Sequence, residues 1–140
     1  MREPKRSILY LDDEVNCLKV FDHFFSGEYD VRTAANLDDA RRALAERPAD
    51  IVISDQAMPE ISGTDFLREV SRAYPRSLRV LLTGSICVGN ALREISSGVV
   101  NLFMAKPWTE AEMRRALERA CAAAALNRPT TRAGSRLNPS

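Results

Sequence analysis

Four apolar runs along the chain end in polar or charged side chains. Turn-forming residues flank them, and they cover about residues 7–12, 50–55, 78–83 and 102–106. The first three are rich in Ile, Leu and Val, and the last contains Leu, Phe and Met. A short apolar run between turn signals is typical of a strand buried on both faces of a parallel sheet. A further short strand is predicted over 30–34. The pattern therefore predicts a five-stranded sheet.

Helical spacing of apolar residues fills the segments between these strands. It predicts helices over about 15–25, 37–47, 64–74 and 88–96, and a last helix that follows Thr109 and runs to about Leu126. Asn36 is a good N-cap for the second helix, and Thr109 with Glu112 forms a capping box for the last one. Gly89 and few apolar positions disfavour the helix over 88–96. Strands that alternate with helices predict an α/β fold, a parallel sheet with helices on both faces.

Length and charge divide the chain into a folded middle and two basic ends. With 140 residues it suits one domain, and we expect a basic lead over 1–6, a folded domain over 7–126 and a disordered polar tail or linker over 127–140. The net charge is +1, but the lead carries +2 and the tail +3, which leaves −4 for the folded part. That balance argues against direct nucleic-acid binding by this domain.

The cysteines and the hydropathy of the chain predict its cellular compartment. Cys17, Cys87 and Cys121 are widely spaced and form no C-x-x-C pair, which favours buried thiols in a reducing environment over a disulfide framework or a zinc site. No apolar run reaches the roughly 18 residues of a membrane-spanning helix, and the first residues do not resemble a signal peptide. We therefore expect a cytoplasmic protein without membrane attachment.

The residues at the ends of the apolar runs predict a site. Parallel strands end at one edge of their sheet, and open α/β sheets bind ligands there. Three carboxylates in one place repel one another, and a hard divalent cation such as Mg²⁺ relieves that repulsion. A phosphoryl group on an aspartate nucleophile would also need an ammonium and a hydroxyl to bind its oxygens. The chain supplies all of these groups at the strand ends: Asp12, Asp13, Asp55, Thr83 and Lys106.

Each of these residues has an ordinary explanation when it is taken alone. An aspartate after a strand is usually a helix cap or a turn residue, and Thr83 before Gly84 fits a simple turn. Lys106 fits a solvated surface charge. A single site explains all of them at once, so the prediction depends on the combination.

The motifs resemble those of the receiver domain of two-component response regulators. The resemblance covers about residues 6–126 and rests on these segments: Leu11-Asp12-Asp13-Glu14, Ser54-Asp55-Gln56-Ala57-Met58-Pro59 with Gly63, Leu82-Thr83-Gly84, and Lys106-Pro107-Trp108. It implies a flavodoxin-like fold with strand order 2-1-3-4-5. It also implies that Asp55 accepts a phosphoryl group from a sensor histidine kinase or a phosphotransfer protein. Such a protein signals and is not an enzyme, apart from possible slow loss of its own phosphoryl group.

The resemblance also implies a metal site and a limited phosphoryl lifetime. Asp12, Asp13, Asp55 and the backbone carbonyl of Ala57 would bind Mg²⁺, with Mn²⁺ as a possible substitute. The side chain of Gln56 would have no essential role. Because Ala57 and Ser85 are small, water would keep a path to the phosphoryl group.

A switch and an output surface are implied in the same way. Thr83 and Lys106 would sense the phosphate, and Phe103 would turn inward as the switch aromatic, by packing alone because it lacks a hydroxyl. The helix over 88–96, the last strand and the last helix would form the output surface. That surface would contact an output domain, an effector or a second copy of the chain.

Rival classes differ at single positions. A haloacid-dehalogenase-like phosphatase needs an acid two residues after its nucleophile, where this chain has Ala57. A dinucleotide binder needs a glycine-rich loop after the first strand, where this chain has acids at 12–14. The open alternative is an interaction module of the same fold that is never phosphorylated, although such modules normally lack one of the five site residues.

Overall fold

The computed structural model describes residues 4–84 and 88–127 of the chain. Within them, five parallel strands form one sheet in the order β2-β1-β3-β4-β5. The strands are β1 (Ser7–Leu11), β2 (Asp30–Ala34), β3 (Ile51–Asp55), β4 (Leu78–Thr83) and β5 (Leu102–Ala105). The predicted fold class and strand order are therefore confirmed. The predictions for Ser85, for Cys87 and for a disordered tail over 128–140 lie outside the described residues.

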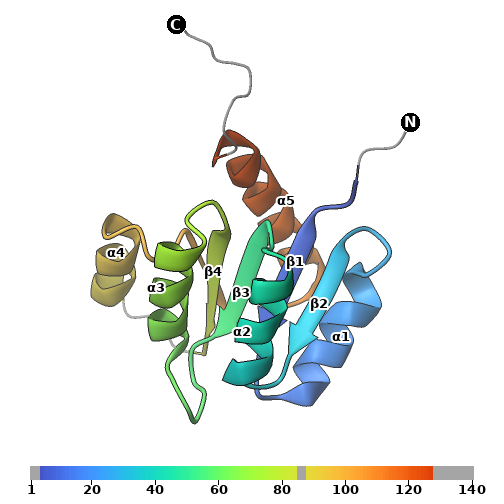
Figure 1. The fold of residues 1–140 in the computed structure, drawn as a ribbon, viewed down its shortest axis with the longest axis horizontal. Coiled ribbons are helices and arrows are strands. Elements are labelled where there is room, and N and C mark those ends of the chain that lie inside the picture. The colour runs from blue at the N-terminus through green and yellow to red at the C-terminus, as the bar shows by residue number, and fades with distance from the viewer. Residues whose placement is uncertain (1–3, 85–87, 128–140) are drawn as a thin grey trace, which may run out of the picture.

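Helices cover both faces of this sheet, as predicted. They are α1 (Val15–Phe25), α2 (Leu37–Glu46), α3 (Gly63–Ala73), α4 (Val88–Ser96) and α5 (Glu110–Asn127). In Figure 1, α2 and α3 lie in front of the sheet, α4 stands beside α3, and α5 lies behind. An ion pair of 3.5 Å between Arg68 of α3 and Glu94 of α4 joins these two helices. None of the described helices is both long and apolar enough to span a bilayer.

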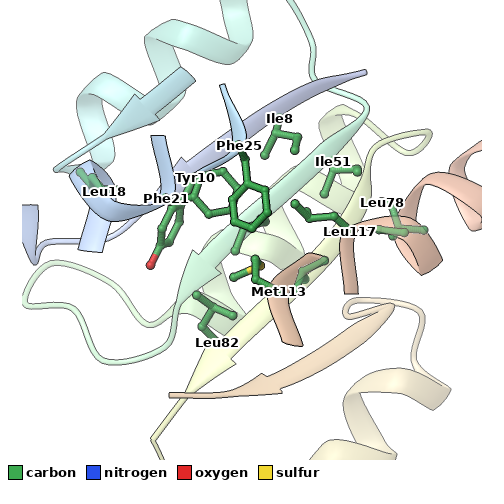
Figure 2. Close-up of a cluster of buried hydrophobic side chains, with 13 residues drawn as sticks. Ile8, Tyr10, Leu18, Phe21, Phe25, Ile51, Leu78, Leu82, Met113 and Leu117 are labelled. Carbon is green, nitrogen blue, oxygen red and sulfur yellow. The ribbon is translucent and has the colours of Figure 1, made fainter. Parts of the chain in front are cut away.

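The alternation of side chains along β1 divides the core into two clusters. Ile8 and Tyr10 point toward α1 and α5, whereas Leu9 and Leu11 point toward α2 and α3. Figure 2 shows the first cluster, in which Tyr10 lies beside Phe21 of α1. Every residue of β1 is buried. A strand covered on both faces carries apolar residues at nearly every position, which explains the continuous runs in the sequence.

Polar caps start the helices near the predicted residues. The Asn36 side chain accepts a hydrogen bond of 2.8 Å from the Asp39 N–H. Thr109 and Glu112 form the reciprocal bonds of a capping box, at 2.9 and 3.1 Å. Helix α3 starts one residue earlier than expected, at Gly63, because the Ser62 hydroxyl caps it.

A buried arginine anchors the loop that follows α4. Arg79 of β4 is 7% exposed, and its guanidinium donates hydrogen bonds to the carbonyls of Ser77 (2.6 Å), Val99 (2.9 Å) and Gly98 (2.9 Å). Burial lowers the pKa of the guanidinium. These bonds tie the segment before β5 to the amino end of β4, at the edge of the sheet opposite the predicted site.

Candidate functional site

The strand register brings the predicted site residues to one edge of the sheet. Ser54 of β3 is paired with Leu11 of β1, and Asp55 is paired with Leu82 of β4. Thr83 is paired with Ala105, and the Lys106 N–H donates a 3.0 Å bond to the Thr83 carbonyl. The chain therefore leaves β1, β3, β4 and β5 at the same edge, as their parallel pairing requires.

Three aspartates come together at this edge. One carboxylate oxygen from each of Asp12, Asp13 and Asp55 lies within 4.8 Å of the others. Asp12 is fully buried and Asp55 is 5% exposed, whereas Asp13 faces solvent. An all-oxygen group with one open side suits Mg²⁺, which uses few protein ligands and keeps several waters. The donor set therefore fits the predicted divalent cation.

Lys106 lies among these acids. Its ammonium is 2.9 Å from Glu14 Oε1, 3.1 Å from Asp12 Oδ2 and 3.3 Å from Asp55 Oδ1. Burial alone would lower the pKa of Lys106, but its hydrogen bonds to Glu14 and Asp12 and the charges of Asp12 and Asp55 raise this pKa above the usual range. The lysine is therefore a permanent cation that touches three carboxylates.

The single ammonium does not balance the acids around it. Burial raises the pKa of Asp55, the Asp12 charge adds to that rise, and Lys106 only partly opposes it. Glu14, which is exposed, has a pKa lowered by its hydrogen bond to Lys106. A site with several carboxylates and one ammonium keeps a surplus of negative charge, which a divalent cation would offset.

Asp12 is fixed from three directions. Its Oδ2 accepts a 2.6 Å hydrogen bond from the Tyr10 hydroxyl as well as the bond from Lys106. Its Oδ1 accepts a 2.9 Å bond from the Glu14 N–H. Burial, together with the bond to Asp12, raises the pKa of the Tyr10 hydroxyl far above its usual value, so this group donates and stays protonated.

The main chain around Asp55 is packed against the start of α3. A Cβ atom at Gly63 would lie 2.3 Å from the Asp55 carbonyl oxygen and 2.7 Å from the Leu81 side chain, so only glycine fits. The Gln56 side chain, for which the family resemblance implies no essential role, accepts hydrogen bonds from the Thr64 N–H (2.8 Å) and hydroxyl (3.1 Å). These contacts hold the first turn of α3 next to the acid group.

The remaining predicted residues occupy different places. Thr83 is 9% exposed at the end of β4. Ala57 is exposed and lines the same groove as Asp55 and Lys106. Phe103 lies in the middle of β5, where it is paired with Leu81 and packs half-buried against the cluster on the α2 and α3 side. It therefore lies away from the acid group.

A groove of about 820 Å³ leads from the acid group along α1. Asp13, Asp55 and Lys106 form its polar end. Its apolar wall comes from Cys17, Val20 and Phe24 of α1 and from Pro107 and Trp108 after β5. Val20 is 45% exposed, so this wall offers apolar surface to a bound molecule.

A five-stranded parallel sheet in this strand order, with an acid group and a lysine at its carboxyl edge, is the arrangement of a signalling receiver domain. The model of the response regulator receiver domain matches residues 8–118, and the chain belongs to this family. Receiver domains bind Mg²⁺ at an acidic pocket and act in two-component signalling, generally as signalling modules and not as enzymes.

Individual relatives and solved structures agree with this assignment. The chain is 26% identical over 108 residues to the hydrogenase transcriptional regulatory protein HoxA of Cupriavidus necator, a match that covers 77% of this chain and 22% of HoxA. It is 33% identical over 133 residues to the transcriptional regulatory protein KdpE of Mycobacterium tuberculosis, covering 87% of this chain and 55% of KdpE. The signal receiver domain of an HD domain-containing protein from Pseudomonas fluorescens superposes with a TM-score of 0.80 at 27% identity, covering 90% of this chain and 93% of that one. The chain spans about a quarter to a half of these curated relatives.

Two contributors to the site were not predicted from the sequence. In the sequence, Tyr10 is one residue of the apolar run over 7–12, whereas in the structure its hydroxyl bonds to Asp12. Glu14 was noted only as part of a motif, although its carboxylate bonds to Lys106. The spacing of Tyr10 and Asp12 offered a signal, because residues two apart on a strand point to the same side.

Proposed function

We propose that this chain is a signalling receiver that takes a phosphoryl group onto Asp55 and then changes its output surface. The observation that carries the proposal is the contact of Lys106 with Asp55 and Asp12 beside the three-aspartate group. The proposal is supported by an ammonium and two further aspartates beside one buried carboxylate. A phosphoryl group on that carboxylate would find positive charge on two sides.

In the proposed reaction a carboxylate oxygen of Asp55 attacks the phosphorus of a phosphohistidine. The new O–P bond forms as the P–N bond breaks, and the departing imidazole nitrogen keeps the electron pair and takes a proton from water. The Lys106 ammonium would pair with the Asp55 carboxylate before the reaction and with the phosphoryl oxygens after it. Asp12, Asp13, Asp55 and the carbonyl of Ala57 would hold Mg²⁺, which neutralises phosphoryl oxygens when bound. Mn²⁺ offers the same coordination chemistry.

The donor would be a sensor histidine kinase or a phosphotransfer protein. Such a partner must bring a histidine side chain within bonding distance of Asp55. The groove along α1 supports this proposal because its apolar wall begins beside the acid group. Val20 and Phe24 would pack against an apolar helix face that carries the histidine.

The proposed output surface consists of α4, β5 and α5. We propose that Thr83 and Lys106 contact the phosphoryl group and that Phe103 changes its packing in response. Arg115 and Arg119 of α5 and Glu112 line a groove with Phe103, which places charged groups beside the proposed switch. The receiver unit would comprise residues 7–126, and an output domain, an effector or a second copy would read this surface.

A direct test is to incubate the chain with Mg²⁺ and a small phosphodonor such as acetyl phosphate, and to measure its intact mass. We expect one added phosphoryl group, located on Asp55 by peptide mapping and absent from Asp55→Asn. Asp65→Asn is the matched control, because Asp65 is an exposed aspartate at the start of α3. It should be labelled like the wild type. No adduct on folded wild-type protein, or an equal adduct on Asp55→Asn, would favour the interaction module that is never phosphorylated.

A further inference from the structure

The Tyr10 hydroxyl is a polar group that the proposed phosphorylation chemistry does not use. Its ring belongs to the cluster on the α1 and α5 side, 5.0 Å from the Phe21 ring in an edge-on arrangement. Figure 2 shows this ring among the apolar side chains of that cluster. The side chain is fully buried, and its oxygen lies 2.6 Å from Asp12 Oδ2. A tyrosine in this position connects the aromatic core to the acid group.

The hydroxyl and Lys106 bind the same oxygen of Asp12 from different sides. Tyr10 donates to Oδ2 at 2.6 Å from within the core, whereas Lys106 donates to it at 3.1 Å from the groove. The Tyr10 bond has the length of a charge-assisted O–H···O⁻ hydrogen bond. Lys106 also contacts Glu14 and Asp55. The position of its ammonium therefore depends on these two carboxylates as well as on Asp12. The tyrosine bond is therefore the one that fixes Oδ2 independently of the groove.

We propose that Tyr10 is a positioning residue for the metal site, which holds the Asp12 carboxylate in the orientation that a divalent cation needs. The inference rests on the proposed function, because Asp12 is a metal ligand only there. Without the hydroxyl, Lys106 is the side-chain donor left on Oδ2. The Glu14 N–H still binds Oδ1, so Oδ2 is then oriented by the ammonium alone and not by the core. A cation then has to compete with a tighter Asp12–Lys106 pair.

The effect on metal binding follows from general behaviour of groups that orient metal ligands. Removal of a hydrogen-bond partner of a ligand weakens metal binding by about 10-fold to 100-fold. We expect Tyr10→Phe to weaken Mn²⁺ and Mg²⁺ binding by about 10-fold. The ring stays in place in this variant, so its contact with Phe21 is retained.

The experiment compares metal binding in three folded variants. The free Mn²⁺ concentration is measured by electron paramagnetic resonance during titration of the full chain, and Mg²⁺ affinity is obtained by competition. Tyr29→Phe is the matched control: Tyr29 packs half-buried against the same cluster, 6.4 Å from the Phe25 ring, and loses the same atom away from Asp12. Phe21→Leu loosens the packing around Tyr10 and leaves its hydroxyl. Circular dichroism and urea unfolding without metal establish that each variant is folded.

We expect weaker metal binding in Tyr10→Phe alone, and metal affinities within about 2-fold of wild type in both other variants. Equal or tighter binding in Tyr10→Phe overturns it, and so does an equal loss in Phe21→Leu, which would make packing the cause. Its failure is distinguishable from failure of the proposed function. If wild-type protein binds Mn²⁺ and Tyr10→Phe binds it equally, only the role of Tyr10 is wrong. If the folded wild type binds no Mn²⁺, both proposals are wrong.

Discussion

Two cations, the buried Arg79 and the half-buried Lys106, lie at opposite edges of the same sheet and have different kinds of partner. Arg79 donates to three backbone carbonyls near the amino end of β4. Lys106 contacts three carboxylates beyond the end of β5. Burial works against both charges, and it lowers the pKa of Arg79. The acids around Lys106 reverse that effect and raise its pKa.

The difference separates a fixed attachment from an exchangeable one. The partners of Arg79 are backbone dipoles, which cannot leave without moving the loop after α4. The partners of Lys106 are carboxylate side chains, two of which, Glu14 and Asp55, line the groove, so a metal ion or a phosphoryl group can compete for these contacts. One cation therefore stabilises the fold, whereas the other stays available for chemistry.

The largest expected effect tests the fixed cation. Arg79→Met should lower the free energy of unfolding by about 4 kcal/mol, because it leaves two buried carbonyls and one part-buried carbonyl without a donor, at a cost of about 1–3 kcal/mol each, part of which relaxation recovers. Urea denaturation measures the loss, and added Mg²⁺ should not restore it. Arg41→Met is the control, because the exposed Arg41–Glu69 pair should contribute less than about 1 kcal/mol. A loss in Arg79→Met no larger than in this control would contradict the assigned role.

A smaller effect is expected at the exchangeable cation. Lys106→Met should cost about 2 kcal/mol without metal, less than a fully buried pair, since the site opens into a groove. Here Mg²⁺ should recover most of the loss, because a divalent cation can take over the charge that the ammonium supplied. Lys19→Met, at an exposed position on α1, should change little in either condition. If Mg²⁺ fails to rescue Lys106→Met, the two cations do not differ in the way described.

The smallest effect concerns pH. The pKa of Asp55 is raised in the folded state, so this carboxyl favours folding at low pH and costs stability as the pH rises through its folded-state pKa. Asp55→Asn should therefore raise the free energy of unfolding by about 1 kcal/mol at neutral pH without divalent metal. The gain should vanish at a pH below the usual carboxyl pKa of about 4. A gain that is the same at both pH values would remove Asp55 ionisation as the cause.

Much of the fold could be predicted from the sequence, because strands and helices are indicated by local patterns of apolar and polar residues. Buried parallel strands read as continuous apolar runs, and the polar residue after each run must lie at the common edge. The meeting of Asp12, Asp55 and Lys106 was predictable on that basis. The Tyr10–Asp12 and Arg79–carbonyl bonds were not, since each depends on where a side-chain tip ends within the packed core. Arg79 gave one signal, a charge inside a run that was otherwise apolar.

The predicted role of Phe103 depends on a change of state. Phe103 has the spacing expected of the switch aromatic, and the structure shows it packed half-buried on β5. A switch requires a second arrangement of the same side chain. Its role therefore stays a prediction, in contrast to the contacts of Lys106.

The close contact at Gly63 limits how the molecule can respond to modification. The first turn of α3 rests directly on the carbonyl of Asp55, with room for a hydrogen atom and no carbon. The backbone at the end of β3 therefore cannot move toward α3 when the side chain of Asp55 gains bulk and charge. If Asp55 is phosphorylated as proposed, we expect the accompanying rearrangement on the side of the acceptor away from α3.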